Sequence, residues 1–168
     1  MLRTISTILV CIGLAACQTS SEVNKPGEES ARVVRAWNIC KSDWKGAEAQ
    51  QVYDACSRVI SEAEDTFWQA GAYNNRSLVL RYWGRQAEEL ADLNDAIRLN
   101  PEYAAAHNNR GWVYAMRGDF ALAFADFEEA LRLKPDSALA HNNYAWFLAE
   151  TGDYEAASRH AERAVALT

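Results

Sequence analysis

A repeat of 34 residues constrains the fold of this chain more than any other feature of its sequence. Moving the 168-residue sequence along itself by 34 positions brings Asn74-Asn75-Arg76 over Asn108-Asn109-Arg110, and then over Asn142-Asn143-Tyr144. Glycines, alanines and leucines coincide under the same shift, namely Gly84, Gly118, Gly152, Ala96, Ala130, Ala164, Leu99, Leu133 and Leu167. A fixed period of this length is typical of stacked supersecondary units. We therefore expect three regular units, at 70–103, 104–137 and 138–168.

Each unit has the pattern of a helical hairpin. In the middle unit, Gly118 and Asp119 separate two runs whose apolar residues recur at three- and four-residue spacing. We expect a first helix (helix A) over about 104–117 and a second (helix B) over about 120–133, which Pro135 ends. A single hairpin cannot bury its apolar side, so neighbouring hairpins must stack. The sequence thus predicts an all-α solenoid of antiparallel helix pairs.

The middle unit resembles a tetratricopeptide repeat at nearly every signature position. These positions are Asn109, Arg110, Gly111, Trp112, Val113, Tyr114, Gly118, Asp119, Phe120, Ala123, Phe127, Ala130 and Pro135. The first unit departs from this pattern, with Ser77 in place of the usual small glycine, Arg85-Gln86 for Asp-Tyr and Glu89 for alanine. The third unit lacks the final proline. The resemblance implies a concave groove lined by the A helices.

A fourth, divergent helix pair is expected upstream, over residues 31–69. Residues 31–41 are suited to a helix A, residues 47–60 have the pattern of a helix B, and a longer connection around 61–69 leads into the regular repeats. The arrangement resembles small exported repeat proteins that begin with a cysteine-linked pair.

The first 16 residues have the layout of a secretory signal, with Arg3 followed by an apolar run over 5–16 that is too short to span a bilayer. The run ends in Leu14-Ala15-Ala16-Cys17, which resembles the lipobox of bacterial lipoproteins. This resemblance implies cleavage before Cys17 and acylation of its thiol, whereas the alternative is an ordinary signal peptide. Gln18, rather than aspartate, follows and favours the outer membrane in such proteins. Residues 17–30 are polar and predict a flexible tether, so we expect a lipid-anchored envelope protein facing the periplasm.

Two of the four cysteines remain after signal removal and acylation, namely Cys40 and Cys56. An even pair in an oxidising compartment favours a disulfide, which here would join helix A to helix B of the divergent pair. A metal pair or a redox pair is the alternative. Two thiols make an incomplete zinc site, and the sequence has no Cys-x-x-Cys motif.

The tetratricopeptide resemblance places peptide-binding candidates on the A helices. Amides can pair with the backbone of an extended strand whatever its sequence. The candidates are Asn75, Asn109 and Asn143 first, then Asn74, Asn108, Asn142, Trp112, Trp146 and Arg81. Each amide could instead bond the neighbouring helix, the tryptophans could pack between A helices, and Arg81 could simply be solvated. No lysine occurs in the A helices of the regular repeats, so the family's lysine and asparagine clamp for peptide C-termini is not reproduced.

Other residue types point away from catalysis and cofactors. His107 and His141 occupy equivalent positions on parallel helices roughly 10 Å apart, too far for one metal ion, and are expected to pack, while His160 has no evident companion. The acidic runs, Glu88-Glu89-Asp92 and Glu128-Glu129, are expected on solvated B-helix faces. The sequence contains no Gly-x-Ser-x-Gly, phosphate-binding glycine loop or His-Glu-x-x-His. A net charge of −6 with interspersed basic residues disfavours nucleic acid.

These observations predict a non-enzymatic adaptor or scaffold lipoprotein that binds a protein or peptide segment in its groove. The alternative is a structural subunit of an envelope complex with permanent partners. Solenoids normally need a polar terminal cap, whereas the last helix B is rich in alanine. Self-association through the C-terminal end is therefore also expected.

Overall fold

The computed structural model describes residues 26–44 and 46–168, which form eight α-helices and one short 3-10 helix. Their bounds are α1 Pro26–Cys40, η1 Gly46–Glu48, α2 Ala49–Glu62, α3 Thr66–Tyr82, α4 Gln86–Leu99, α5 Ala104–Arg117, α6 Phe120–Leu133, α7 Ala138–Thr151 and α8 Tyr154–Ala166. The predicted signal peptide over 1–16, the lipidation site Cys17 and most of the 17–30 tether lie outside the described residues. No described helix is long and apolar enough to cross a membrane.

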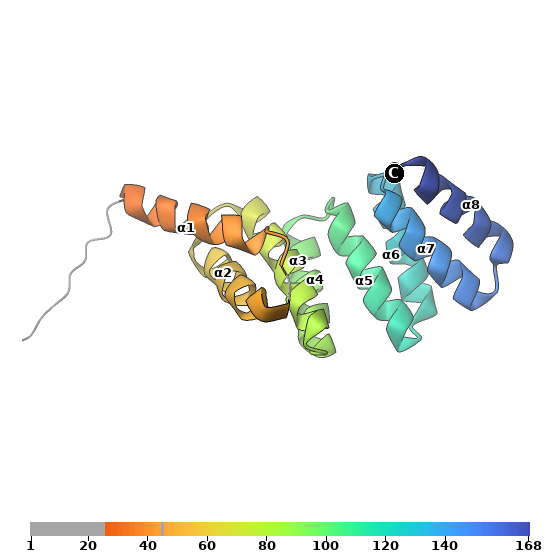
Figure 1. The fold of residues 1–168 in the computed structure, drawn as a ribbon, viewed down its shortest axis with the longest axis horizontal. Helices are drawn as coiled ribbons and strands as arrows, with labels where there is room; N and C mark the ends of the chain where they lie inside the picture. Colours follow the sequence, from red (N-terminus) through yellow and green to blue (C-terminus); the bar gives the residue numbers. More distant parts are fainter. Residues whose placement is uncertain (1–25, 45) are drawn as a thin grey trace, which may run out of the picture.

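The helices stack in chain order from α1 to α8 as antiparallel pairs (Figure 1). The predicted all-α solenoid is confirmed, and the bounds expected for the two helices of the middle repeat coincide with α5 and α6. The chain turns between α5 and α6 at Gly118, whose φ of 81° lies in the left-handed region that favours glycine. The equivalent glycines of the first and third repeats also have positive φ, so one turn chemistry serves all three hairpins.

Two helix starts differ from the sequence-based expectation. Helix α1 begins at Pro26 rather than near Ala31, so the last part of the predicted tether is helical. Proline is favoured at the first helical position because its missing N–H would have no partner there. Helix α3 begins at Thr66 rather than Ala70, and the Asp65 side chain accepts a hydrogen bond from the Phe67 N–H at 2.7 Å. The connection between α2 and α3 is therefore short.

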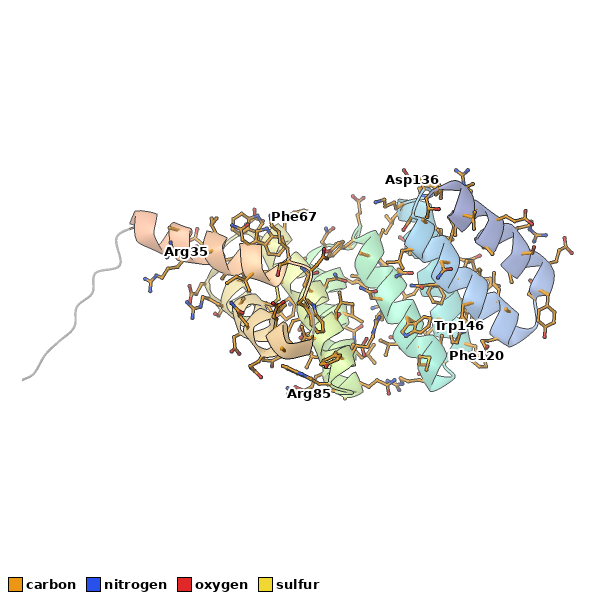
Figure 2. The ribbon with its side chains drawn as sticks, viewed as in Figure 1. Arg35, Phe67, Arg85, Phe120, Asp136 and Trp146 are labelled. Carbon is orange, nitrogen blue, oxygen red and sulfur yellow. A yellow bond between two sulfur atoms is a disulfide. The ribbon has the colours of Figure 1, made fainter. Side chains whose placement is uncertain are left out.

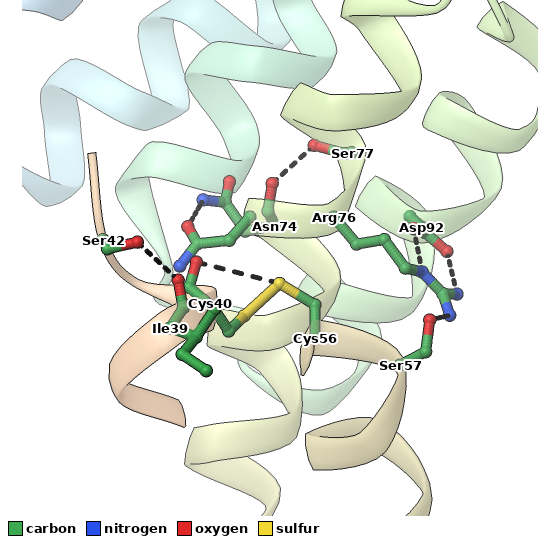
Figure 3. Close-up of a disulfide and its surroundings, with 10 residues drawn as sticks. Ile39, Cys40, Ser42, Cys56, Ser57, Asn74, Arg76, Ser77 and Asp92 are labelled. Atoms are coloured by element: carbon green, nitrogen blue, oxygen red, sulfur yellow. Dashed lines mark hydrogen bonds and ion pairs between the residues drawn. A yellow bond between two sulfur atoms is a disulfide. The ribbon is translucent and has the colours of Figure 1, made fainter. Parts of the chain in front are cut away.

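A disulfide joins Cys40, at the end of α1, to Cys56 in the middle of α2, as predicted (Figure 3). Their Cα atoms lie 4.8 Å apart, and both residues are buried among apolar side chains from α1, α2 and α3. Trp37 of α1 stacks on Trp68 of α3 with ring centroids 5.9 Å apart. The divergent pair is thus fixed covalently within itself and by packing to the first regular repeat.

The core of the middle repeat depends on one close approach between its helices. A Cβ atom added at Gly111 of α5 would lie 3.2 Å from the Phe127 ring and 3.3 Å from the carbonyl oxygen of Ala123, both on α6. Phe127 and Ala123 are fully buried. The small residues Gly111 and Ala123 therefore let α5 and α6 pack closely around the Phe127 ring.

Candidate functional site: the concave face of the A helices

The A helices α3, α5 and α7 lie on the inner side of the stack. Neighbouring A helices contact one another, whereas each described B helix contacts mainly its own A helix and the A helix that follows. A stack whose elements approach more closely on one side curves toward that side, so the A helices line the concave surface. Figure 2 shows Trp146 of α7 on this side, directed toward α5.

A ladder of side-chain amides crosses the three A helices. Asn143 donates to Asn108 at 3.1 Å and Asn109 donates to Asn74 at 2.9 Å, so each bond joins neighbouring helices. Within one helix, Asn108 donates to Asn109 at 3.4 Å and Asn74 donates to Asn75 at 3.1 Å. No buried side-chain nitrogen or oxygen among the described residues lacks a hydrogen-bond partner. The ladder therefore satisfies polar groups that stacking would otherwise bury at a cost.

The ladder corrects part of the predicted peptide-binding set. Asn74, Asn108 and Asn109 are buried, with exposed fractions of 4%, 3% and 8%, so these three amides hold helices together instead of facing a partner. Asn75 and Asn143 are half-buried, and Asn142 is exposed. The prediction that the second asparagine of each pair contacts a bound peptide is therefore wrong at Asn109. The A helices approach closely enough there for Asn109 to bond Asn74 directly.

An apolar stripe runs beside the ladder. Trp112 of α5 and Trp146 of α7 pack against each other with ring centroids 4.6 Å apart, and Trp146 keeps 37% of its surface exposed. Tyr82 and Met116, at equivalent positions of α3 and α5, are 60% and 57% exposed. The two tryptophans were predicted site residues, whereas Tyr82 and Met116 were missed. Each lies four residues after Leu78 or Trp112, a spacing that puts them on the same helix face and could have identified them.

The loop after α1 closes one end of this stripe. Trp44 packs edge-on against Tyr82 with ring centroids 5.4 Å apart. Between the loop and α3 lies a cleft of about 270 Å³, lined by Cys40, Lys41, Ser42, Asp43, Trp44, Asn75 and Leu78. The loop follows directly from the disulfide-bonded Cys40, so the bridge also fixes the position of this loop beside the groove.

Arg81, a predicted site residue, is engaged within its own chain. Its Nε atom lies 2.6 Å from Glu89 Oε1, and its Nη2 donates to the Asn109 carbonyl at 3.3 Å. Glu89 is only 3% exposed, although the sequence pattern placed it on a solvated face. Burial raises the pKa of Glu89, and Arg81 opposes that rise. Arg81, which was predicted to bind a carboxylate of a partner, therefore pairs with the buried carboxylate of Glu89 instead.

Two arginine clamps that were not predicted tie helix A to the B helices on either side. Arg76 of α3 binds both carboxylate oxygens of Asp92 on α4, at 2.7 and 2.8 Å, and donates to Ser57 on α2. Arg110 of α5 likewise binds Asp126 on α6 and donates to Asn94 on α4. Asp92 is buried, so its placement on a solvated face was wrong. Each clamp joins two successive hairpins.

The two clamp carboxylates have opposite pKa shifts. Burial raises the pKa of Asp92 despite the hydrogen bonds from Arg76. Burial also acts to raise the pKa of Asp126, but hydrogen bonds from Arg110 and His107 outweigh it and leave this pKa below its ordinary value. Asp126 has a second donor, since His107 Nδ1 lies 2.9 Å from its Oδ1, whereas the nearby charges of Asp95 and Glu88 raise the pKa of Asp92 further.

The histidines pack as predicted, but His160 has a partner. His107 and His141 are buried, and their Nε2 atoms lie 3.0 and 3.1 Å from the carbonyls of Pro101 and Pro135. His160 was expected to lack a companion, yet its Nδ1 lies 2.8 Å from Nδ1 of His141. In the third repeat His160 and Tyr144 occupy the positions of Asp126 and Arg110. No group of three or more His, Cys, Asp or Glu in residues 26–44 and 46–168 could hold a metal ion.

This histidine pair predicts a pH response confined to the last repeat. His141 Nε2 must donate to the Pro135 carbonyl, so its Nδ1 accepts from Nδ1 of His160. Burial, with His141 and Arg159, lowers the pKa of His160. The unfolded chain then binds more protons, so the contribution of His160 to the stability of α8 is fully present above about pH 6.5 and is lost as the pH falls below that value.

We expect the free energy of unfolding of the third repeat to drop by no more than about 1 kcal/mol between neutral and mildly acidic pH, because His160 is partly exposed and solvent screens its charge. Urea titrations followed by hydrogen exchange of α8 amides at several pH values measure it. The substitution His160→Asp recreates the histidine and aspartate pairing of the middle repeat and should abolish or reverse the acid loss. An unchanged pH profile in that variant would disprove the role of the pair.

Comparisons with known proteins agree with this architecture of a helical-repeat protein. Family models for the tetratricopeptide repeat match residues 85–138 and 114–167. Residues 85–167 are therefore tetratricopeptide repeats, as the sequence signature predicted. No curated protein sequence matches the chain.

Several solved structures share the fold. A crystal structure of MamA superimposes with a TM-score of 0.59 at 19% identity, covering 84% of this chain and 89% of that chain. YrrB, described as a TPR protein with an unusual peptide-binding site, gives 0.58 at 18% identity over 84% of this chain and 66% of its own. A Thermobaculum terrenum O-GlcNAc transferase mutant gives 0.64 at 23% identity over 71% of this chain but 22% of its own. At these identities the likeness concerns the fold.

Proposed function

We propose that this chain is a non-enzymatic adaptor of the bacterial cell envelope that binds an apolar segment of another protein along its concave face. The exposed stripe of Tyr82, Met116 and Trp146 is the observation that carries the proposal. Large apolar and aromatic side chains left exposed in a row are typical of interaction surfaces, since burying them on binding is favourable. The peptide-binding site named for YrrB, which shares the fold, also supports it.

The proposed groove combines this stripe with the accessible amides at the two ends of the ladder. Asn75 lines the cleft beside the loop after α1, and Asn143 is half-buried at the other end of the ladder. These amides and the exposed Asn142 can bond the backbone of an extended segment, whose apolar side chains then contact Trp112 and Trp146. The partner is therefore an apolar or aromatic stretch of a protein, and the chain acts on it without a cofactor.

The lipobox-like sequence around Cys17 supports anchoring of the adaptor by an acyl chain. In the proposed arrangement, Cys17 holds the chain at the periplasmic face of the outer membrane. The remaining polar residues before α1 then link the lipid to the helix stack.

A structural subunit with permanent partners is the second candidate, favoured by one observation at the C-terminal end. On α8, Tyr154 and Val165 keep 73% and 76% of their surface exposed. In a longer solenoid the corresponding side would be covered by a further hairpin. A second copy of the chain or a permanent partner would bury it in this alternative.

Substitution within the stripe separates the two candidates. We expect Met116→Glu with Trp146→Ala to weaken partner recovery in an envelope pull-down at least tenfold, because a charge and a lost aromatic contact together cost more than about 1.4 kcal/mol. The matched control is Leu122→Glu, which adds the same charge at a 52% exposed apolar residue of helix B. Circular dichroism confirms that each variant folds. Full retention of partners by the double variant would favour the structural subunit and contradict the adaptor.

A further inference from the structure

A second cavity lies at the N-terminal end of the stack, away from the groove. It has a volume of about 640 Å³ between α1 and α2, and its lining includes Arg35, Ala36, Ile39, Asp54, Ala55 and Arg58. In the order of the stack, α1 and α2 form the first described pair, with α3 on their other side. Figure 2 shows Arg35 extending from α1 away from the rest of the stack.

The lining of this cavity has an apolar floor and a basic rim. Ala36, Ile39 and Ala55 supply the apolar part. Both walls carry arginine, with Arg35 on α1 and Arg58 on α2, whereas the lining contains a single acidic residue, Asp54, which accepts a hydrogen bond from Gln50 at 2.9 Å. Arg58 keeps 55% of its side chain exposed and lies 4.0 Å from Glu62, the outer limit of an ion pair. Its guanidinium is thus available to an anion.

We propose that this cavity binds the headgroup of an anionic phospholipid. Arginine binds phosphate oxygens through paired N–H donors, and the apolar floor can receive the glycerol and first methylenes of the lipid. The position of the cavity fits a membrane, because α1 begins at Pro26, shortly after Cys17, the proposed acylation site, in the sequence. In this respect the inference rests on the proposed anchor, but it is independent of the groove.

Charge distribution makes the inference specific. The whole chain carries a net charge of −6, so non-specific adsorption to an anionic surface is opposed. Binding to such a surface requires a local basic site, and each arginine near an anionic leaflet contributes a several-fold gain in partition. Docking through α1 and α2 would leave the concave face of α5 and α7, farther along the stack, open to its partner.

Vesicle sedimentation tests the cavity without signal or acyl anchor when the protein begins at residue 17, as the proposed cleavage leaves it, and carries Cys17→Ser. Vesicles of phosphatidylglycerol mixed with phosphatidylcholine should sediment more protein than pure phosphatidylcholine, and Arg35→Gln with Arg58→Gln should lower this anion-dependent fraction about tenfold. The control Arg98→Gln with Arg163→Gln, on α4 and α8, changes the net charge equally and should retain binding.

Three results would overturn the proposal. These are equal sedimentation with both vesicle types, an equal loss in the control variant, and displacement by inorganic phosphate at matched ionic strength, which would assign the cavity to free phosphate. Since the variants leave Met116 and Trp146 intact, partner recovery in the pull-down reports the groove separately from the vesicle result.

Discussion

Replacing Asp126 by alanine should destabilise the middle repeat by about 3 kcal/mol. The carboxylate is 5% exposed and accepts from both Arg110 and His107, so its removal leaves a half-buried guanidinium and an imidazole without their acceptor. Breaking one member of a buried ion pair typically costs about 3–5 kcal/mol, and the 20% exposure of the Arg110 side chain favours the lower end. Urea denaturation followed by far-ultraviolet circular dichroism measures the loss.

Two comparisons make this expectation specific to the clamp. Asp95→Ala removes the acid of an exposed pair with Arg98 and should cost no more than about 0.5 kcal/mol. The contribution of Asp126 should also fade in acid. Its pKa is lower in the folded chain than in the unfolded one, so its stabilisation is present at neutral pH and lost as the pH drops below about 4. Equal losses for the Asp126 and Asp95 variants at neutral pH would contradict a structural clamp.

Loss of the disulfide should have a comparable effect at the other end of the molecule. In the double variant Cys40→Ala with Cys56→Ala, we expect the first helix pair to lose about 3 kcal/mol, the constraint that closing a loop of this length puts on the unfolded chain. Trp37 and Trp44 pack against the core that holds the bridge, so their fluorescence reports the change directly.

Reductant provides the matched control for the disulfide. Dithiothreitol should lower the urea midpoint of the natural chain and leave that of the double variant unchanged. Hydrogen exchange should accelerate in α1 and α2 but remain similar in α7 and α8, because stability in a solenoid is approximately a sum of local terms. Identical midpoints of the natural chain with and without reductant would refute this role.

The repeat pattern predicted the helices well because local spacing determines them. A glycine turn, a small residue where two helices meet and a period of 34 residues fix the hairpins of the middle repeat, and α5 and α6 have the expected bounds. The starts of α1 and α3 were less accurate because capping decides them. Pro26 and Asp65 extend these helices beyond the repeat signature.

Side-chain partners between helices were harder to predict. Spacing put the asparagines on one helix face but could not reveal that Asn109 and Asn74 lie within 2.9 Å, since this depends on how closely α3 and α5 approach. The arginine clamps did leave a signal, because the interval from Arg76 to Asp92 recurs from Arg110 to Asp126. In the third repeat both members change together, to Tyr144 and His160, which is the pattern expected of direct contact.

The location of a bound partner tests the central claim most directly. A photo-reactive phenylalanine analogue placed at Met116, on the concave face, should cross-link a partner in intact cells, whereas the same analogue at Leu122, on helix B, should not. Both positions are more than half exposed, so access of the probe is matched. Cross-linking confined to Met116 is the result predicted here, and cross-linking through Leu122 alone would contradict binding in the groove.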